Sequence, residues 1–598
     1  MLFSWLLVSF AQSPVVNNPK KQRPVLLAET RIEISHYGRT EAINKQLANF
    51  KYKVWSSTLN EQIEKSVTDF LQQEGYFLPV LDSARIAFTG DSQYVTLHQF
   101  WRSGPRFELA LPNLRWQSFG GEDSLIRRDS LLLLKEIEPL QGLPYNRPNQ
   151  QLLLARLVRF YEERGYPLCR VETGGFVTDS LGENRLGLHL NLHIKTGPQV
   201  KLKGILLPPK SDLDPGYFIR SFRMKLPELY REERIRRYHD ILKRQDFIEE
   251  AETPQLVQES DSVFYLFLNF KESAATAFDG IVGYVPPPAN RTEASGYFTG
   301  MVNLGLKNIF GTGRRFDVFW KKPDRHSEEF NVKYREPFLL GMPFHTSGMM
   351  HRTVRDTTYI EWIYQAEVEL PLTDQLSAIA GVSRRIVNPD SLASRVLRYP
   401  RTDAIQSRFG LVWDRRNARL FPTSGFYFDI KLDYGQQKNI GPAYLIEEDS
   451  LPGSYRVSRI SSSLKFYQRF FKNQVLAINL ETHLVGYNGR DVQLPDMIWF
   501  GGARTIRGYR ESQFFADRLY FGNFEYHFQL GPQSSLFVFS DVGYYSRNQP
   551  DYKEDILIGY GMGLRFPAPL GVMQVDYGLA RGGSFQEGKL HVRIINDL

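Results

Sequence analysis

A glycine-rich loop with an arginine at its centre precedes two predicted strands that each carry one carboxylate. The loop is the stretch 499–510, and its centre reads Arg507-Gly508-Tyr509. The stretch 519–530 alternates apolar with polar residues, Glu525 among the polar ones, as a strand with one apolar and one wet face does. The next predicted strand, 536–545, carries Asp541 at the parity of two phenylalanines. These groups are suited to ion pairing and hydrogen bonding.

Signatures of catalysis or ligand binding do not accompany this charged set. The sequence contains no Gly-x-Ser-x-Gly, His-Glu-x-x-His or Gly-Lys-Ser/Thr motif. The glycines within 311–313 and 559–563 lack the strand–loop–helix context of a phosphate site, and we interpret them as turn and barrel-bend glycines. His189 and His193 have no third ligand at a sensible spacing, which favours a polar strand face. We therefore predict no enzymatic activity, no cofactor and no metal.

Length and composition limit the class of protein. A chain of 598 residues is long enough for about four domains. The mean hydropathy of −0.35 is that of a soluble protein, but a transmembrane β-barrel hides its lipid-facing residues at every second position and can share that value. The net charge of +8 is dispersed, so nucleic-acid binding is not expected. The only cysteine, Cys169, excludes an intramolecular disulfide and is predicted to be a small buried residue.

The first eleven residues resemble a short secretory signal. They are rich in Leu, Phe, Trp and Val and end in Ser9-Phe10-Ala11, with small residues at the two positions that a signal peptidase reads. No Lys or Arg precedes the apolar run, which departs from the usual pattern. We assign residues 1–11 as a signal peptide, which predicts export of the chain.

Three stretches of the first half share one design, an amphipathic helix followed by an alternating pair of strands. The predicted helices span 59–77, 151–166 and 231–247. Gly75 and Gly165 end the first two, as a residue in the left-handed C-terminal cap does. Helices followed by strands in repeats of about 80 to 90 residues predict small α+β modules in tandem. We place these modules at 28–106, 107–200 and 201–273.

The second half is predicted to be all strand. From about residue 277 the helical periodicity stops and does not return, and successive segments alternate apolar with polar residues. About sixteen such segments fill the remaining chain, and Tyr and Phe recur at strand ends as the interfacial girdles of a membrane barrel require. A soluble β-sandwich explains less well why one face stays apolar through so many strands. The predicted fold is α+β modules followed by a 16-stranded antiparallel transmembrane barrel over 277–598.

Motifs in both halves resemble one protein family. The three modules in series are similar to POTRA domains, periplasmic modules that offer a sheet edge to an extended peptide. In the second half, four stretches in order resemble the barrel signatures of the BamA/TamA superfamily of outer-membrane insertases: 308–314, 334–338, 414–425 and 501–509. The resemblance covers nearly all of the mature chain. Three modules rather than five make the TamA-like branch the closer match.

The resemblance also assigns a role to the glycine-rich loop. In the family, a long extracellular loop folds back into the barrel, and its Arg-Gly-Phe/Tyr tip contacts acidic residues of the inner wall. The matching positions are the tip Arg507, Gly508 and Tyr509 and the partners Glu525 and Asp541. An arginine fork donates two parallel hydrogen bonds to a carboxylate and stays charged in a partly dry lumen. The loop glycines Gly501 and Gly502 are expected to allow its tight turns.

The junction between the first and last strands is the expected working edge. The first strand contains Gly280 and Gly283 and runs into prolines at 286–288, which cannot donate ladder hydrogen bonds. The last strand, about 589–595, contains Val592 and Ile594 and alternates well but is short. A poorly paired seam is a sheet edge that an incoming strand can occupy.

These expectations lead to a function and an alternative. The chain is expected to insert β-barrel proteins into the bacterial outer membrane, or to move proteins across it, with its modules in the periplasm. Its partners would be unfolded outer-membrane proteins and the lipid bilayer, and an inner-membrane or lipoprotein partner stays open. The alternative is a two-partner-secretion transporter, which shares the barrel and loop but typically has two modules behind a plug helix. The C-terminus, 594–598, lacks the terminal aromatic of most outer-membrane barrels.

Overall fold

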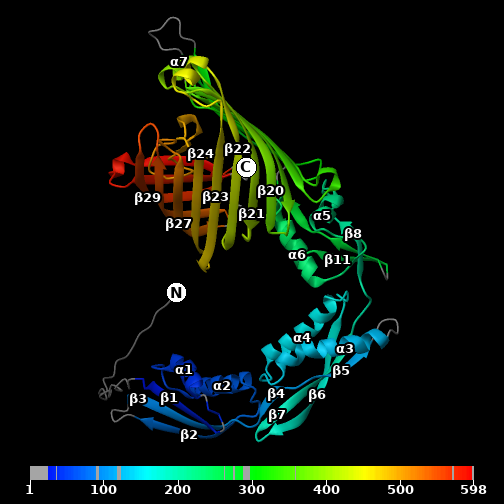
Figure 1. Ribbon diagram of the computed structural model, residues 1–598. Coiled ribbons are helices and arrows are strands. Elements are labelled where there is room, and N and C mark those ends of the chain that lie inside the picture. The colour runs from blue at the N-terminus through cyan, green and yellow to red at the C-terminus, as the bar shows by residue number, and fades with distance from the viewer. Residues whose placement is uncertain are drawn as a thin grey trace, which may run out of the picture. The chain divides into compact units, whose positions relative to one another are not determined.

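The computed structural model describes most of the chain after its N-terminus. The described residues are 24–35, 37–38, 40–88, 93–117, 123–260, 263–273, 276–286, 296–356, 358–419, 421–531, 533–568 and 571–595. The expected signal peptide and most of the expected proline run at 286–288 lie outside them. Two compact units are distinguished (Figure 1). One comprises the chain up to Lys201 with Leu229–Glu232, and the other comprises Leu202–Glu228 and Glu233–Leu598.

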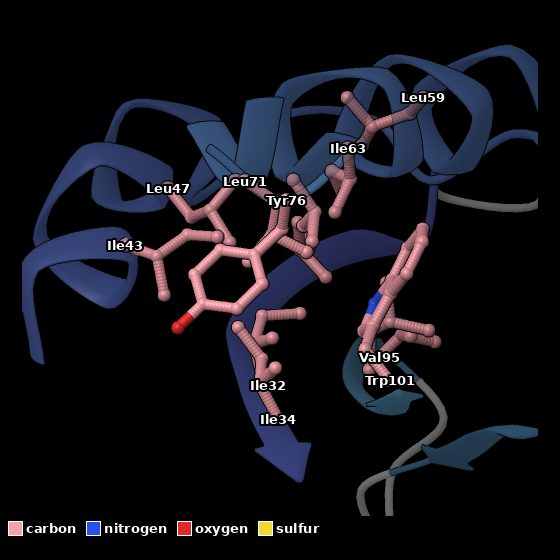
Figure 2. Close-up of a cluster of buried hydrophobic side chains, with 13 residues drawn as sticks. Ile32, Ile34, Ile43, Leu47, Leu59, Ile63, Leu71, Tyr76, Val95 and Trp101 are labelled. Atoms are coloured by element: carbon pink, nitrogen blue, oxygen red, sulfur yellow. The ribbon is translucent and has the colours of Figure 1, made fainter. Parts of the chain in front are cut away.

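The first α+β module packs two helices on a three-stranded sheet. Its elements are β1 (Leu26–Ser35), α1 (Thr40–Leu47), η1 (Ala48–Phe50), α2 (Ser57–Gln73), β2 (Val80–Phe88) and β3 (Tyr94–Arg102). The central strand β3 is parallel to β1 and antiparallel to β2. Helix α2 buries one residue per turn, Leu59, Ile63, Val67 and Leu71, as an amphipathic stripe does. These side chains face those of the sheet in one core (Figure 2).

The second module repeats this arrangement. Its elements are β4 (Arg106–Leu109), β5 (Asn113–Gln117), α3 (Asp123–Ile137), η2 (Glu138–Leu140), α4 (Arg147–Glu162), β6 (Arg170–Gly182) and β7 (Arg185–Lys195). Strand β7 is parallel to β4 and β5 and antiparallel to β6. The glycines predicted to end α2 and α4 have left-handed backbones, with φ of 93° at Gly75 and 95° at Gly165.

The third module begins the second unit. Its elements are β8 (Lys201–Leu206), α5 (Pro215–Ser221), β9 (Glu228–Leu229), α6 (Glu232–Lys243), β10 (Ile248–Ala251), β11 (Gln255–Ser260), β12 (Val263–Phe267) and β13 (Phe270–Glu272). One sheet has the order β11-β12-β8-β9. The pattern in the sequence predicted the second helix of each module but not α1, α3 and α5. Helix α5 is only seven residues long, too short for its periodicity to stand out.

Sixteen antiparallel strands form one continuous sheet in the C-terminal part, which confirms the predicted fold class. In sheet order they are β14 (Thr276–Val285), β15 (Tyr297–Ile309), β16 (Arg314–Lys322), β17 (Glu328–Glu336), β18 (His345–Arg355), β19 (Tyr359–Pro371), β20 (Leu376–Pro389), β21 (Arg401–Asp414), β22 (Gly425–Gly441), β23 (Ser454–Phe471), β24 (Gln474–Tyr487), β27 (Arg518–Gly531), β28 (Ser534–Arg547), β29 (Lys553–Ala568), β30 (Gly571–Ala580) and β31 (Lys589–Ile595). The sheet curls into a barrel (Figure 1).

The two faces of the barrel wall differ in polarity. On β27 the apolar series is exposed, with Phe524 at 39% and Phe528 at 45% of their accessible surface, whereas His527 is buried. On β28, Val538 and Val542 are exposed and Asp541 is fully buried. Exposed apolar residues and a polar interior are what a barrel in lipid requires.

Short helices occur within the barrel half, against the expectation that helix does not return after residue 277. They are η3 (Leu339–Gly341), α7 (Ser391–Val396), α8 (Ala443–Glu448), η4 (Leu494–Asp496) and η5 (Phe585–Glu587). Each has only three to six residues, less than the window in which a 3.6-residue period can be recognised. No helix in the described ranges is long and apolar enough to span a membrane.

The third module contacts the turns at one end of the barrel strands. Asp246 pairs with Arg315 at 3.0 Å, and Arg315 also pairs with Asp317 at 2.8 Å. The main-chain N–H of Asp214 donates to the carbonyl of Gly311 at 2.9 Å. Gly311 and Gly313 have φ of 69° and 74°, so their predicted role as turn glycines fits the backbone. A Cβ on Gly313 would stand 2.3 Å from the ring of Tyr217, so the module packs directly on this turn.

Candidate functional site

The predicted loop folds as a small hairpin against the inner wall of the barrel. The long loop, residues 488–517, joins β24 to β27 and contains β25 (Ile498–Phe500) paired with β26 (Phe514–Ala516). Phe500 and Ile506 are almost fully buried, and they belong to a cluster with the wall residue Tyr545. The turns of the hairpin need left-handed backbone, with φ of 108° at Gly501, 98° at Gly502 and 91° at Gly508.

The structure brings Arg507 together with both predicted carboxylates. Its Nε and Nη2 donate to the two carboxylate oxygens of Asp541 at 2.8 and 2.7 Å, and its main-chain N–H donates to Asp541 Oδ2 at 2.9 Å. Its Nη1 donates to Glu525 Oε1 at 2.6 Å. The arginine side chain is 3% exposed and that of Asp541 is 0% exposed. This cluster of Arg507, Glu525 and Asp541, called the lock below, is therefore a buried, charge-assisted network.

Strand alternation places the lock residues on one inner surface. Asp541 follows Phe537 and Phe539 at every second position of β28, and all three are buried. The guanidinium carbon of Arg507 lies 3.5 Å from the ring centroid of Phe539, a cation–π contact. On β27, His527 Nε2 lies 2.9 Å from the second oxygen of Glu525. The wall thus supplies both the negative charge and an aromatic surface for the guanidinium.

A third carboxylate, missed in the sequence, completes the environment of the arginine. Asp576 of β30 is 0% exposed, and its Oδ2 lies 3.7 Å from Arg507 Nη1. Gln574 donates to both oxygens of Asp576 at 2.9 and 2.8 Å, and accepts from Arg565 Nη2 at 2.8 Å. Alternation along 572–580 could have placed Asp576 on the inner face, but its distance from Arg507 depends on the pairing of β27 to β30.

The sequence predicted that the glycines of β29 are bends of the barrel; in the structure they leave room for the loop and for neighbouring rings. None of Gly559, Gly561 and Gly563 has a left-handed backbone. A Cβ on Gly559 would stand 1.9 Å from the carbonyl oxygen of Arg507, and one on Gly578 would stand 2.7 Å from the nitrogen of Gly508. The tip therefore lies on a surface without side chains, which allows the main chain of the loop to approach the main chain of the wall.

The rest of the tip contacts the last strands. The main-chain N–H of Gly508 donates to Nε2 of His591 on β31 at 3.3 Å. The hydroxyl of Tyr509 donates to the carbonyl of Ile558 at 3.3 Å. Asn523 on β27 donates to the carbonyl of Thr505 at 2.7 Å. The tip thus bridges β27 to β31, including the strand that ends the sheet.

The predicted seam residues lie on the two strands that end the sheet. Strand β14 pairs with β15 over ten residues, and β31 pairs with β30 over seven. In the parts of β14 and β31 that the structure describes, no ladder joins them. Gly280 shares the outward parity of the exposed Phe278 and Val282, and Val592 is 58% exposed. The same parity places Gly283 on the other face, whereas the side chain of Ile594 lies outside the described part of β31.

Other residues considered from the sequence belong to the second module. His189 pairs with Asp179 at 3.1 Å on the second module. Cys169 is buried in the core of that module, and burial raises the pKa of its thiol to about 12. Among the described residues no cluster of His, Cys, Asp or Glu could hold a metal ion. The arrangement of the lock, a saturated ion-pair network without a free nucleophile, is suited to holding the loop in place.

Comparison with known proteins places the barrel half in a family. Residues 308–589 match the model of the Omp85 superfamily domain. No curated protein matches the chain.

Solved structures similar to this chain include two kinds of protein. One is BamA from Haemophilus ducreyi lacking POTRA domains 1–3, with 13% identity and a TM-score of 0.49 over 80% of this chain and 98% of that one. Others are CdiB from Escherichia coli, with 12% identity and a TM-score of 0.47 over 88% and 94%, and CdiB from Acinetobacter baumannii, with 11% and 0.45 over 90% and 95%.

Proposed function

We propose that this chain, whose residues 308–589 match the Omp85 superfamily domain, is an outer-membrane β-barrel protein with POTRA-like modules and assembles client proteins there. In this proposal it inserts β-barrel proteins into the outer membrane, or moves proteins across it, through the seam between β14 and β31. Membership of the TamA-like branch stays a prediction.

The observation that carries the proposal is the unpaired edge on either side of the seam. In a closed barrel every strand is paired on both sides, which removes exposed edges. Here the described parts of β14 and β31 each have one partner only. A row of unpaired N–H and C=O groups is a template for an incoming strand, which gains main-chain hydrogen bonds whatever its sequence. This suits a protein that acts on many clients.

The lock supports the same proposal. A seam that opens needs a rigid wall beside it, and the tip holds β27 to β31 together through Arg507, Tyr509 and Gly508. The last strand is only seven residues long, and the hydrogen bond from Gly508 to His591 adds to its short ladder with β30. We propose that the docked tip keeps the C-terminal wall in order while the edge of β31 stays available.

The modules are proposed to lie in the periplasm and to present clients to the barrel. Strand β2 is an edge of its sheet, and its side chains Val80, Ile86 and Phe88 are each about half exposed or more. An exposed edge strand with apolar side chains can take an extended segment by strand addition. An inner-membrane or lipoprotein partner is compatible with the remaining module surface.

A depletion experiment separates this function from the alternative of a dedicated two-partner-secretion transporter. We expect removal of the chain to lower the abundance of many outer-membrane barrel proteins, measured by quantitative proteomics of the outer membrane. Loss of one secreted protein, with the barrel proteins unchanged, would instead identify the transporter. No change in either fraction would contradict both proposals.

A crosslinking experiment tests the seam itself. Val282 on β14 and Val592 on β31 both point outward and are exposed, so a Val282→Cys/Val592→Cys variant can be joined by a flexible bismaleimide in a Cys169→Ala background. We expect the joined barrel to lose activity in assembling a client into vesicles. The matched control joins Val538→Cys to Met562→Cys, which face each other on the paired strands β28 and β29. Full activity of the joined seam variant would exclude the seam as the working edge.

A further inference from the structure

A second ionic cluster, not predicted from the sequence, holds the other end of the long loop. Asp496 ends the short helix η4 and is 2% exposed. Two wall arginines contact its side chain: Arg459 Nη2 donates to Oδ1 at 2.6 Å, and Arg385 forms a short ion pair with the same oxygen. Gln437 donates to Oδ2 at 3.0 Å, and the hydroxyl of Tyr487 donates to it as well.

The barrel wall also forms hydrogen bonds with the main chain of this part of the loop. Arg385 donates to the carbonyl of Pro495 at 2.7 Å, and Arg459 donates to the carbonyl of Asp496 at 3.1 Å. Arg385 is also paired with Glu361 of β19. Both oxygens of the carboxylate and two adjacent carbonyls therefore have partners on the wall, as the stability of a buried charge requires.

The partners of Asp496 and of Arg507 lie on different parts of the sheet. Those of Asp496 are on β20, β22, β23 and β24, which are the seventh, ninth, tenth and eleventh strands in sheet order. Those of Arg507 are on β27, β28 and β30, the twelfth, thirteenth and fifteenth. In a 16-stranded barrel, the outermost of these strands, β20 and β30, are eight strands apart and lie on opposite sides of the lumen, whereas β24 and β27 are neighbours in the sheet. The charges are also inverted: an acidic loop residue meets basic walls, and a basic one meets acidic walls.

We propose that Asp496 is a second anchor of the long loop, and that the loop spans the lumen between its two anchors and closes it to ions and solutes. With the tip alone docked, the stem of the loop, residues 494–500, could leave the opposite wall and open a path between the loop and β20 to β24. With both ends docked, the hairpin β25–β26 is held across the lumen. Asp496 is thus a positioning residue of the closed state. This inference does not depend on which clients the barrel handles.

The test measures ion flow through single barrels of the full chain in planar lipid bilayers. We expect Asp496→Asn, which keeps the shape of the side chain and removes its charge, to raise the occupancy of the conducting state about tenfold or more, because hydrogen bonds to a charged group are lost. Arg459→Gln should act in the same direction from the wall side. The matched control is Asp491→Asn, because Asp491 belongs to the same loop and is exposed; its conductance should equal that of the wild type.

Hydrogen exchange of the loop amides gives a second measurement. In Asp496→Asn we expect residues 494–500 to exchange about tenfold faster, while residues 505–509 keep their protection. Wild-type conductance and wild-type protection in a folded Asp496→Asn barrel would overturn the proposal. If this variant does not fold, amide exchange in the wild-type barrel tests the proposal instead. We then expect the stem, residues 494–500, to be as protected as the tip, residues 505–509. Exchange of the stem as fast as that of the exposed residues 489–491 would overturn it equally.

Discussion

Removal of the arginine at the loop tip is the sharpest test of the lock. In Arg507→Ala, the carboxylates of Asp541 and Asp576 stay in a wall where both side chains are 0% exposed. Glu525 still has two cationic or hydrogen-bonding neighbours, because its Oε2 lies 2.9 Å from His527 Nε2 and 3.9 Å from Arg565 Nη2. Asp541 keeps a single donor, the main-chain N–H of residue 507. The variant therefore leaves at least one buried carboxylate largely uncompensated.

The expected cost follows from that geometry. Removing one partner of a buried, hydrogen-bonded ion pair costs about 3–5 kcal/mol, and 3 kcal/mol is already more than about a hundredfold in an equilibrium constant. Arg507→Lys should lie between the wild type and the alanine variant, because an ammonium keeps the charge but cannot donate the parallel pair of hydrogen bonds. The double variant Arg507→Ala/Asp541→Ala removes the uncompensated charge. It should be less destabilised than the sum of the single variants by about 2 kcal/mol.

The assay is urea unfolding of the refolded barrel in lipid vesicles, followed by heat-modifiability on gels. The unfolding free energy of Arg507→Ala is expected to fall, whereas protease digestion should release intact modules as in the wild type. Arg504→Ala is the matched control, because Arg504 lies in the same loop and is exposed; we expect a change within about 0.5 kcal/mol. An Arg507→Ala barrel with wild-type unfolding, wild-type heat-modifiability and full complementation in cells would refute the role of the lock.

Three further predictions concern the wall and the modules. Gly559→Val should prevent docking of the tip and reduce heat-modifiable barrel, because even a Cβ would stand 1.9 Å from the carbonyl of Arg507; Gly348→Ala, with no heavy atom within 4 Å of its added Cβ, should fold normally. The Cys169 thiol, whose pKa burial raises from 9.0 to about 12, should resist iodoacetamide at pH 8 until urea is added. Rapid labelling without urea would contradict its burial. Because the thiol ionises at a lower pH in the unfolded chain than in the folded one, the stability of its module should fall as pH rises from 9.0 to about 12. Ser56→Ala removes the N-cap bond to the amide of Leu59, 3.1 Å long, and should cost module 1 about 1 kcal/mol; unchanged amide exchange in α2 would count against it.

Local patterns in the sequence determine most of the architecture. The period of two predicts sixteen strands, and the last of them, 589–595, has the same bounds in the structure. The same period places Glu525 on the inner face and Phe524 on the outer face, because successive side chains of a strand point in opposite directions. The glycine caps after α2 and α4 are equally local, since a left-handed residue is needed wherever a helix ends in this way.

Tertiary structure alone decides which of these residues meet. Arg507 and Asp576 are far apart in the chain, and their approach depends on the register of four strands and on the loop folding inward. Nothing in the neighbourhood of Asp496 distinguishes it from an exposed acidic residue such as Asp491, and only the opposite wall makes it buried and paired. The glycines of β29 likewise have a role only once the loop lies on them. Alternation along a strand sets which face a side chain occupies, whereas its partners across the lumen are set by the closure of the sheet.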